Sequence, residues 1–75
     1  MVLDITQKSI MADPYLFLQG LSNYYDEFQA EHGTPEEILM NQDQFTWFQN
    51  SRKKLNQDFN LVEGDKYKNI QVNGI

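Results

Sequence analysis

The clearest hydrophobic pattern lies in the first half of the chain and predicts a long helix. Leucines and aromatics recur there at three- and four-residue steps, as on the apolar stripe of a helix: Phe17, Leu18, Leu21, Tyr24, Tyr25 and Phe28. Asp13 is a good N-cap, Pro14 suits the first helical position, and Gly33 is typical of the residue after a last turn. We therefore expect a helix from Pro14 to about His32. Upstream of it, Leu3 and Ile5 alternate with polar residues, which favours a short edge strand within residues 2–10.

The segment that follows Gly33 supports two predictions. Thr34 and Glu37 have the spacing of a capping box, which would begin one helix from Pro35 to about Phe59. Alternatively, residues 37–40 form a short buried strand and Asn41 caps a later helix, with Gln44 three residues on. In either case one helical face would carry Phe45, Phe48, Leu55 and Phe59, and in the shorter helix Arg52 completes this row. We favour the strand, because residues 41–43 are polar and have poor helix propensity.

The end of the chain predicts a β-hairpin. Two β-prone runs, Leu61–Val62 and Tyr67–Val72, flank a turn centred on Gly64 within residues 63–66. We therefore expect one small α+β domain over residues 1–75. It has a long N-terminal helix, a second helix and a small antiparallel sheet built from Ile38–Met40, Leu61–Val62 and Tyr67–Val72. The alternative is a mainly α domain with a C-terminal hairpin.

Charge is distributed unevenly along the chain. The net charge is −5, and residues 9–51 contain no Lys or Arg but carry Asp13, Asp26, Glu27, Glu31, Glu36, Glu37 and Asp43. An acidic surface of this kind repels nucleic acid and membranes and attracts basic proteins. The chain has no Cys, so disulfides and thiol chemistry are excluded. It has neither a signal-peptide pattern nor an apolar run of about 20 residues, and we expect it in the host-cell cytoplasm or in a virion.

Residues 47–54, Trp-Phe-Gln-Asn-Ser-Arg-Lys-Lys, resemble the centre of the homeodomain recognition helix. The resemblance implies that Asn50 reads an adenine while Arg52, Lys53 and Lys54 hold phosphates. However, Ser51 stands where that family has Arg, and the net charge opposes phosphate binding. We therefore interpret the string as an amphipathic helix with a coincidental similarity. A small DNA-binding domain is kept as the alternative function.

Residues 36–75 loosely resemble a segment in the peripheral domain of tailed-phage capsid proteins. The matching residues are Ile38–Asn41, read as a strand before a helix, and Tyr67-Lys68-Asn69-Ile70-Gln71-Val72. In the family a glycine and a proline stand where this chain has Asn69 and Gln71. The resemblance implies a small phage structural or accessory protein, and it supplies no catalytic residues.

Catalytic and metal-binding patterns are scarce. The one histidine, His32, follows Glu27 and Glu31, two carboxylates on one helical face that could pair with it as acid and base. A solvated helix face explains these residues equally simply, so we expect no enzyme, no cofactor and no metal site.

These observations predict a non-catalytic protein-interaction protein of phage or mobile-element type. It would act in virion assembly or as an acidic inhibitor of a host protein, for example a DNA-binding protein or nuclease. The expected protein-binding residues are Tyr24, Tyr25, Asp26, Glu27, Phe28 and Glu31. Aromatic side chains often anchor interfaces, and the carboxylates would give charge complementarity. The partner would be a second copy, a virion component or a basic host protein. We expect neither nucleic acid nor a membrane as a partner, and self-association remains open.

Overall fold

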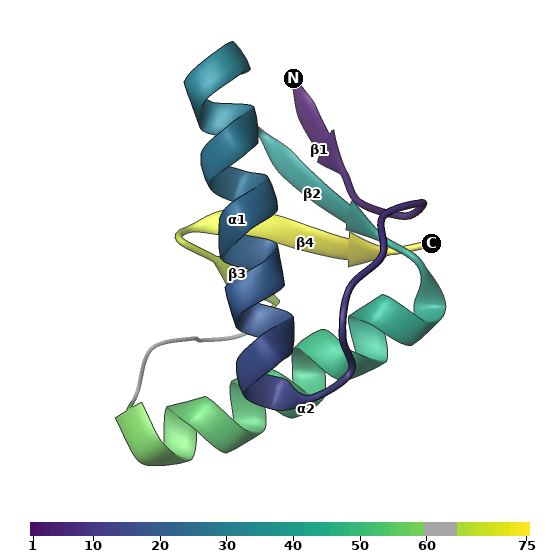
Figure 1. Ribbon diagram of the computed structural model, residues 1–75, viewed down its shortest axis with the longest axis vertical. Helices are drawn as coiled ribbons and strands as arrows, with labels where there is room; N and C mark the ends of the chain where they lie inside the picture. The colour runs from purple at the N-terminus through teal and green to yellow at the C-terminus, as the bar shows by residue number, and fades with distance from the viewer. Residues whose placement is uncertain (60–64) are drawn as a thin grey trace.

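The computed structural model describes residues 1–59 and 65–75, which form an α+β fold of two helices and a four-stranded mixed sheet (Figure 1). The elements follow in the order β1 (Val2–Asp4), α1 (Pro14–His32), β2 (Glu37–Met40), α2 (Gln42–Phe59), β3 (Lys66–Tyr67) and β4 (Ile70–Gly74). The predicted fold class is therefore confirmed. The predicted strand at residues 37–40 is also confirmed, and a continuous helix from Pro35 is wrong.

The sheet has the strand order β1-β2-β4-β3. β2 pairs in parallel with both β1 and β4, and only β3 and β4 are antiparallel. The expectation of a wholly antiparallel sheet is thus corrected to a mixed one. α1 connects the parallel strands β1 and β2, and α2 lies in the connection that runs from β2 through β3 to its parallel neighbour β4, because parallel neighbours need a long crossover connection. β1 is the edge strand that the alternation at Leu3 and Ile5 predicts.

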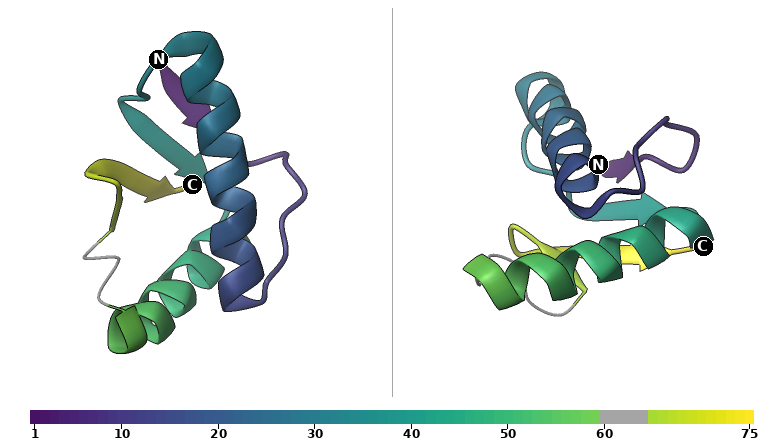
Figure 2. Two further views of the ribbon diagram at one scale, coloured as in Figure 1. Left: turned by 60° about the vertical axis from the view of Figure 1, so that its left-hand side comes forward. Right: turned by 60° about the horizontal axis from the view of Figure 1, so that its bottom comes forward.

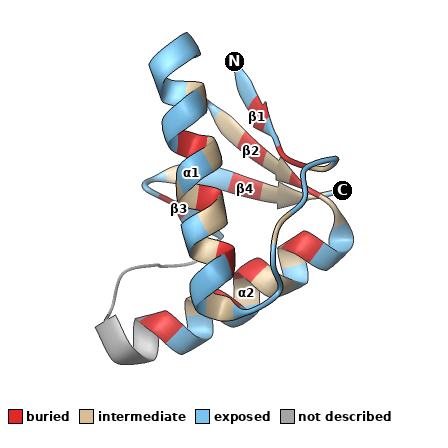
Figure 3. Ribbon diagram, viewed as in Figure 1, coloured by how far each residue is buried: buried red, intermediate tan, exposed pale blue. Residues whose placement is uncertain are grey.

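One face of the sheet builds the core. Leu3, Ile38 and Val72 are in register on three neighbouring strands and are buried. Figure 3 marks a buried segment on each of these strands, and Figure 2 shows the two helices against the sheet. From the helices, Phe17, Leu21 and Phe48 complete this cluster. The alternate strand positions, among them Val2, Asp4, Glu37, Leu39, Gln71 and Asn73, are exposed or half-buried. None of the described elements covers that second face of the sheet.

Helix α1 begins and ends where its caps predict. The Asp13 side chain accepts hydrogen bonds from the N–H groups of Tyr15 and Leu16, at 3.0 and 3.2 Å. Pro14 is the first helical residue. Gly33, with φ of 81°, follows the last turn, and its N–H donates to the Gln29 carbonyl at 2.9 Å. A residue with a side chain would be strained in this left-handed conformation.

The start of α2 is a junction that ties three segments together. The Gln44 N–H donates to Asn41 Oδ1, and the Asn41 N–H donates to Gln44 Oε1, both at 2.8 Å, as in a capping box. The buried Gln44 amide also donates to the carbonyls of Ile5 and Lys8, at 2.7 and 3.1 Å. Asn41 Nδ2 donates to the Thr6 carbonyl at 3.0 Å. The predicted Asn41 cap is confirmed, and it also fixes the loop that follows β1.

The C-terminal hairpin turns later than predicted. Lys68 and Asn69, with φ of 49° and 68°, connect β3 to β4, whereas residues 67–72 were expected to form one strand. Two consecutive positive φ angles match the twist of a two-residue hairpin, and Asn tolerates this conformation better than most residues. The predicted strand Leu61–Val62 and residues 63–64 of the predicted turn lie outside the described residues, and Lys66, expected in that turn, belongs to β3.

β1 ends in a local polar turn. Asp4 Oδ1 accepts hydrogen bonds from the Thr6 hydroxyl at 2.6 Å and from the Thr6 N–H at 2.9 Å. These two bonds, the hydroxyl first, hold the pKa of the Asp4 carboxyl below its ordinary value of 3.8. Asp4 therefore carries its negative charge at neutral pH at the exposed edge of the sheet.

Replacing Gln44 tests the junction. Gln44→Met should lower the free energy of unfolding by about 2 kcal/mol, because it removes the cap partner and leaves the Lys8 carbonyl without its donor. The matched control is Gln42→Met on the exposed side of the same turn, which should cost less than about 0.5 kcal/mol. Urea unfolding measures both values. Equal effects of the two variants would contradict the role of Gln44.

Removing the Asp4 charge should destabilise the fold in a pH-dependent way. Since the folded-state pKa is lowered, the contribution of Asp4 is fully present above the ordinary pKa and is lost as the pH falls through the folded pKa. Asp4→Asn should therefore cost more stability at pH 7 than at pH 3. In NMR titrations, Thr6→Val should raise the Asp4 pKa towards its ordinary value. An unchanged pKa in Thr6→Val would show that Thr6 is not the cause.

Candidate functional site

A groove runs between the C-terminal half of α1 and the edge strand β1. Its volume is about 410 Å³, within the range of about 300–1,000 Å³ typical of binding pockets. It is lined by Val2, Leu3, Asp4, Lys8, Tyr24, Glu27, Phe28, Glu31 and His32. Leu3 is buried and forms apolar floor, while Glu27 and Glu31 stand exposed on the helical wall.

Helical periodicity places the wall residues on one row. Tyr24, Phe28 and His32 are four residues apart, and Glu27 and Glu31 lie beside them, so all five face the groove. The Tyr24 hydroxyl donates to the Ser9 carbonyl at 2.7 Å, which attaches the loop after β1 to the helix. The Lys8 ammonium lies 5.8 Å from the centre of the Tyr24 ring and lines the groove beside it.

The groove is lined by three carboxylates and by two basic residues, Lys8 and His32. Glu31 lies 3.6 Å from His32, whose ring packs on Phe28 with centroids 4.9 Å apart. Across the described part of the chain, no Lys or Arg forms an ion pair with Glu27 or Glu31. Asp4 adds a third negative charge, which its low pKa maintains. The groove therefore combines half-buried aromatic surface with negative charge.

The predicted protein-binding residues separate into three groups. Tyr24, Glu27, Phe28 and Glu31 come together in the groove. Tyr25 is buried, and its ring packs edge-on against Tyr67 with centroids 5.7 Å apart, so it contributes to the core. Asp26 is exposed but lies outside the groove lining.

Sequence reasoning did not place β1 and its loop at this site. The alternation around Leu3 predicts the strand, but no local pattern indicates that residues 2–4 lie beside the last turns of α1. Lys8 was not predicted as a site residue either. The signal that could have identified it is its position as a single basic residue before a long segment without Lys or Arg.

The homeodomain-like string supplies core residues and a solvated helix face. Phe48 and Ser51 are fully buried, and the Ser51 hydroxyl donates to the Trp47 carbonyl at 2.8 Å. Asn50, Lys53 and Lys54 are exposed on α2. These three side chains share one helical face.

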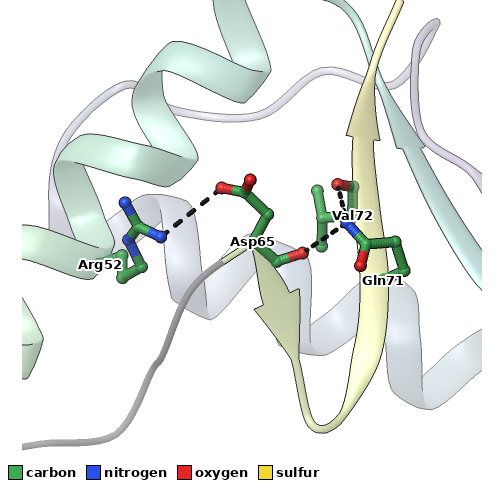
Figure 4. Close-up of polar contacts among 4 residues, drawn as sticks. All are labelled: Arg52, Asp65, Gln71 and Val72. Atoms are coloured by element: carbon green, nitrogen blue, oxygen red, sulfur yellow. Dashed lines mark hydrogen bonds and ion pairs between the residues drawn. The ribbon is translucent and has the colours of Figure 1, made fainter.

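Arg52 is engaged within the fold. Its Nη1 lies 3.5 Å from Asp65 Oδ1, next to the start of β3 (Figure 4). The Asp65 carbonyl accepts the Val72 N–H at 2.8 Å and the Gln71 side-chain amide at 3.4 Å, which fixes Asp65 beside β4. Arg52 thus joins α2 to the hairpin, a structural role that phosphate binding would have to disrupt.

The remaining chemistry of the described residues is limited. His32 and Glu31 are both exposed, at 39% and 76%, so this pair has no enclosed reaction site. Among the side chains that the structure describes, those of residues 1–55 and 65–75, no three His, Asp or Glu are grouped to hold a metal ion. Neither α1 nor the described part of α2 has the apolar length needed to span a bilayer.

Comparison of the chain with protein-family models, with curated proteins and with solved structures finds no match in any of the three.

Proposed function

We propose that this protein is a non-catalytic protein-interaction protein that binds its partner in the groove between α1 and β1. The observation that carries the proposal is the meeting of Tyr24, Phe28, Glu27 and Glu31 in one groove beside an unpaired strand edge. Aromatic side chains contribute large contact area at interfaces, and charges at the rim select the partner and speed its association.

Charge complementarity supports a basic partner. The chain has a net charge of −5, and Glu27 and Glu31 have no Lys or Arg counterion among the described residues. A partner that supplies Lys or Arg would recover electrostatic energy that water and salt screen in the free protein. The partner would be a virion component during assembly or a basic host protein that this chain inhibits. The phage or mobile-element origin of such a protein is supported only by the residue pattern at 36–75.

The proposal is tested with charge-matched variants. Glu27→Gln with Glu31→Gln removes two charges from the groove, whereas Asp26→Asn with Asp43→Asn removes two exposed charges outside it. Each protein is immobilised and used to capture proteins from the producing cell, and light scattering gives its mass alone and with duplex DNA in low salt. We expect a protein partner, or self-association, that the groove variant weakens and the control variant preserves.

Two results would contradict the proposal. One is a monomer that captures no protein in any form of the experiment. The other is a monomer that co-elutes with DNA in a way that Lys53→Ala with Lys54→Ala abolishes, which would establish the DNA-binding alternative.

A further inference from the structure

We infer that the groove receives an extended, basic segment of the partner, which pairs with β1 as a fifth strand of the sheet. This inference rests on the proposed function and specifies how the partner binds. Strand addition to an exposed sheet edge is a recurring mode of peptide recognition, in which main-chain hydrogen bonds give affinity and neighbouring pockets give specificity.

The backbone of β1 is arranged for such pairing. The Ile5 N–H donates to the Leu39 carbonyl at 3.0 Å, and the Met1 carbonyl accepts the Glu36 N–H at 2.9 Å. The backbone N–H and carbonyl groups of the odd-numbered residues thus point towards β2. Because backbone polar groups alternate between the two edges of a strand, Val2 and Asp4 direct theirs to the free edge. β1 has no proline, lysine or bulge, the devices that commonly block edge pairing.

The spacing of the groove wall matches an extended chain. Alternate side chains of a strand are about 6.6–6.8 Å apart. Glu27 and Glu31, one helical turn apart, are separated by about 6 Å along the α1 axis. Two basic side chains at alternate positions of an added strand would therefore meet one carboxylate each. Their aliphatic stems would cover Phe28, and the residues between them would lie beside the exposed side chain of Val2 on the opposite face of the sheet.

The charges favour a basic segment over a second copy of this chain. β1 carries only a carboxylate, Asp4, and would offer Glu27 and Glu31 of another copy no cation. Lys8 lies beside Tyr24 and would repel a cation there, so the basic residues of the partner segment are expected beside Glu27 and Glu31. The segment thus needs an alternating pattern of Arg or Lys with β-branched residues.

The probe is the synthetic peptide acetyl-Thr-Val-Arg-Val-Arg-Val-Thr-amide, which places both arginines on one face of a strand. Titration into the labelled full chain, followed by NMR, should give saturable shifts at Val2, Asp4, Glu27 and Glu31. Amide exchange of Val2 and Asp4 should slow on saturation. Glu27→Gln with Glu31→Gln should weaken binding about fivefold, whereas Asp26→Asn with Asp43→Asn should change it less than twofold.

Backbone pairing is separated from simple charge attraction by two changes. Val2→Pro removes the N–H at the free edge and should weaken binding about threefold to tenfold, while Val2→Ala, which keeps that N–H, should not. Two further peptides carry N-methyl groups either on the two arginines or on the three valines. Their affinities should differ at least tenfold, because the backbone N–H groups of only one of these two sets point towards β1.

The inference is overturned if the peptide does not bind, if Val2→Pro and Val2→Ala bind equally well, or if the two methylated peptides are equivalent. None of these results would remove the proposed function, which requires only that a protein partner depends on Glu27 and Glu31. A dimer in light scattering that the peptide does not dissociate would identify a second copy of the chain as the occupant, and it would also overturn the inference.

Discussion

The junction of Asn41 and Gln44 is the constraint on which the rest of the structure depends. A polar side chain with 2% exposure is unfavourable unless its hydrogen bonds are made, and Gln44 makes them to Asn41 and to two carbonyls of the loop after β1. It caps α2 at the end of β2 and holds the carbonyls of Ile5 and Lys8. The same interaction therefore fixes the start of the second helix and the path of the chain as it leaves β1.

This constraint extends to the candidate site. Lys8 lines the groove, and the carbonyl of the next residue, Ser9, accepts a hydrogen bond from the Tyr24 hydroxyl. The loop after β1 is thus held by Gln44 on one side and by α1 on the other. A groove with both walls fixed before binding loses less conformational entropy when a partner arrives. In the proposed function, the buried amide would therefore support the interface as well as the fold.

Local signals explain which features could be predicted. Asp13, Pro14 and Gly33 act through the backbone of their own turns, so they identified α1, and Asn41 identified the start of α2. The sheet was misjudged because the pairing signal in the sequence is the antiparallel hairpin near the C-terminus, whereas the apolar run at residues 38–40 gives no local indication of strand direction. Parallel sheets, moreover, usually have both faces covered. Here the parallel strands leave one face uncovered, and strand direction depends on the crossover helices, which short strands do not encode.

The candidate site was predictable only in part for a related reason. The helical row of Tyr24, Glu27, Phe28 and Glu31 follows from periodicity alone. Whether Tyr25 belongs to that row or to the core depends on where Tyr67 arrives, 42 residues later in the sequence. The contribution of β1 depends on its parallel pairing with β2. Long-range contacts of this kind decide which side of a wide apolar stripe remains accessible.

The sheet itself distinguishes the groove from an ordinary surface depression. The sheet formed by the described residues has two edge strands, β1 and β3. β3 has only two residues, one of them the exposed Lys66, a combination that discourages further pairing. β1 has no such protection except the charge of Asp4, which repels acidic strands and attracts basic ones. In the proposed binding mode, this edge and the two carboxylates of the neighbouring helix would select a partner by its charge while the backbone of β1 binds it. Binding at this surface would then depend on the backbone groups of β1 that no described strand pairs with.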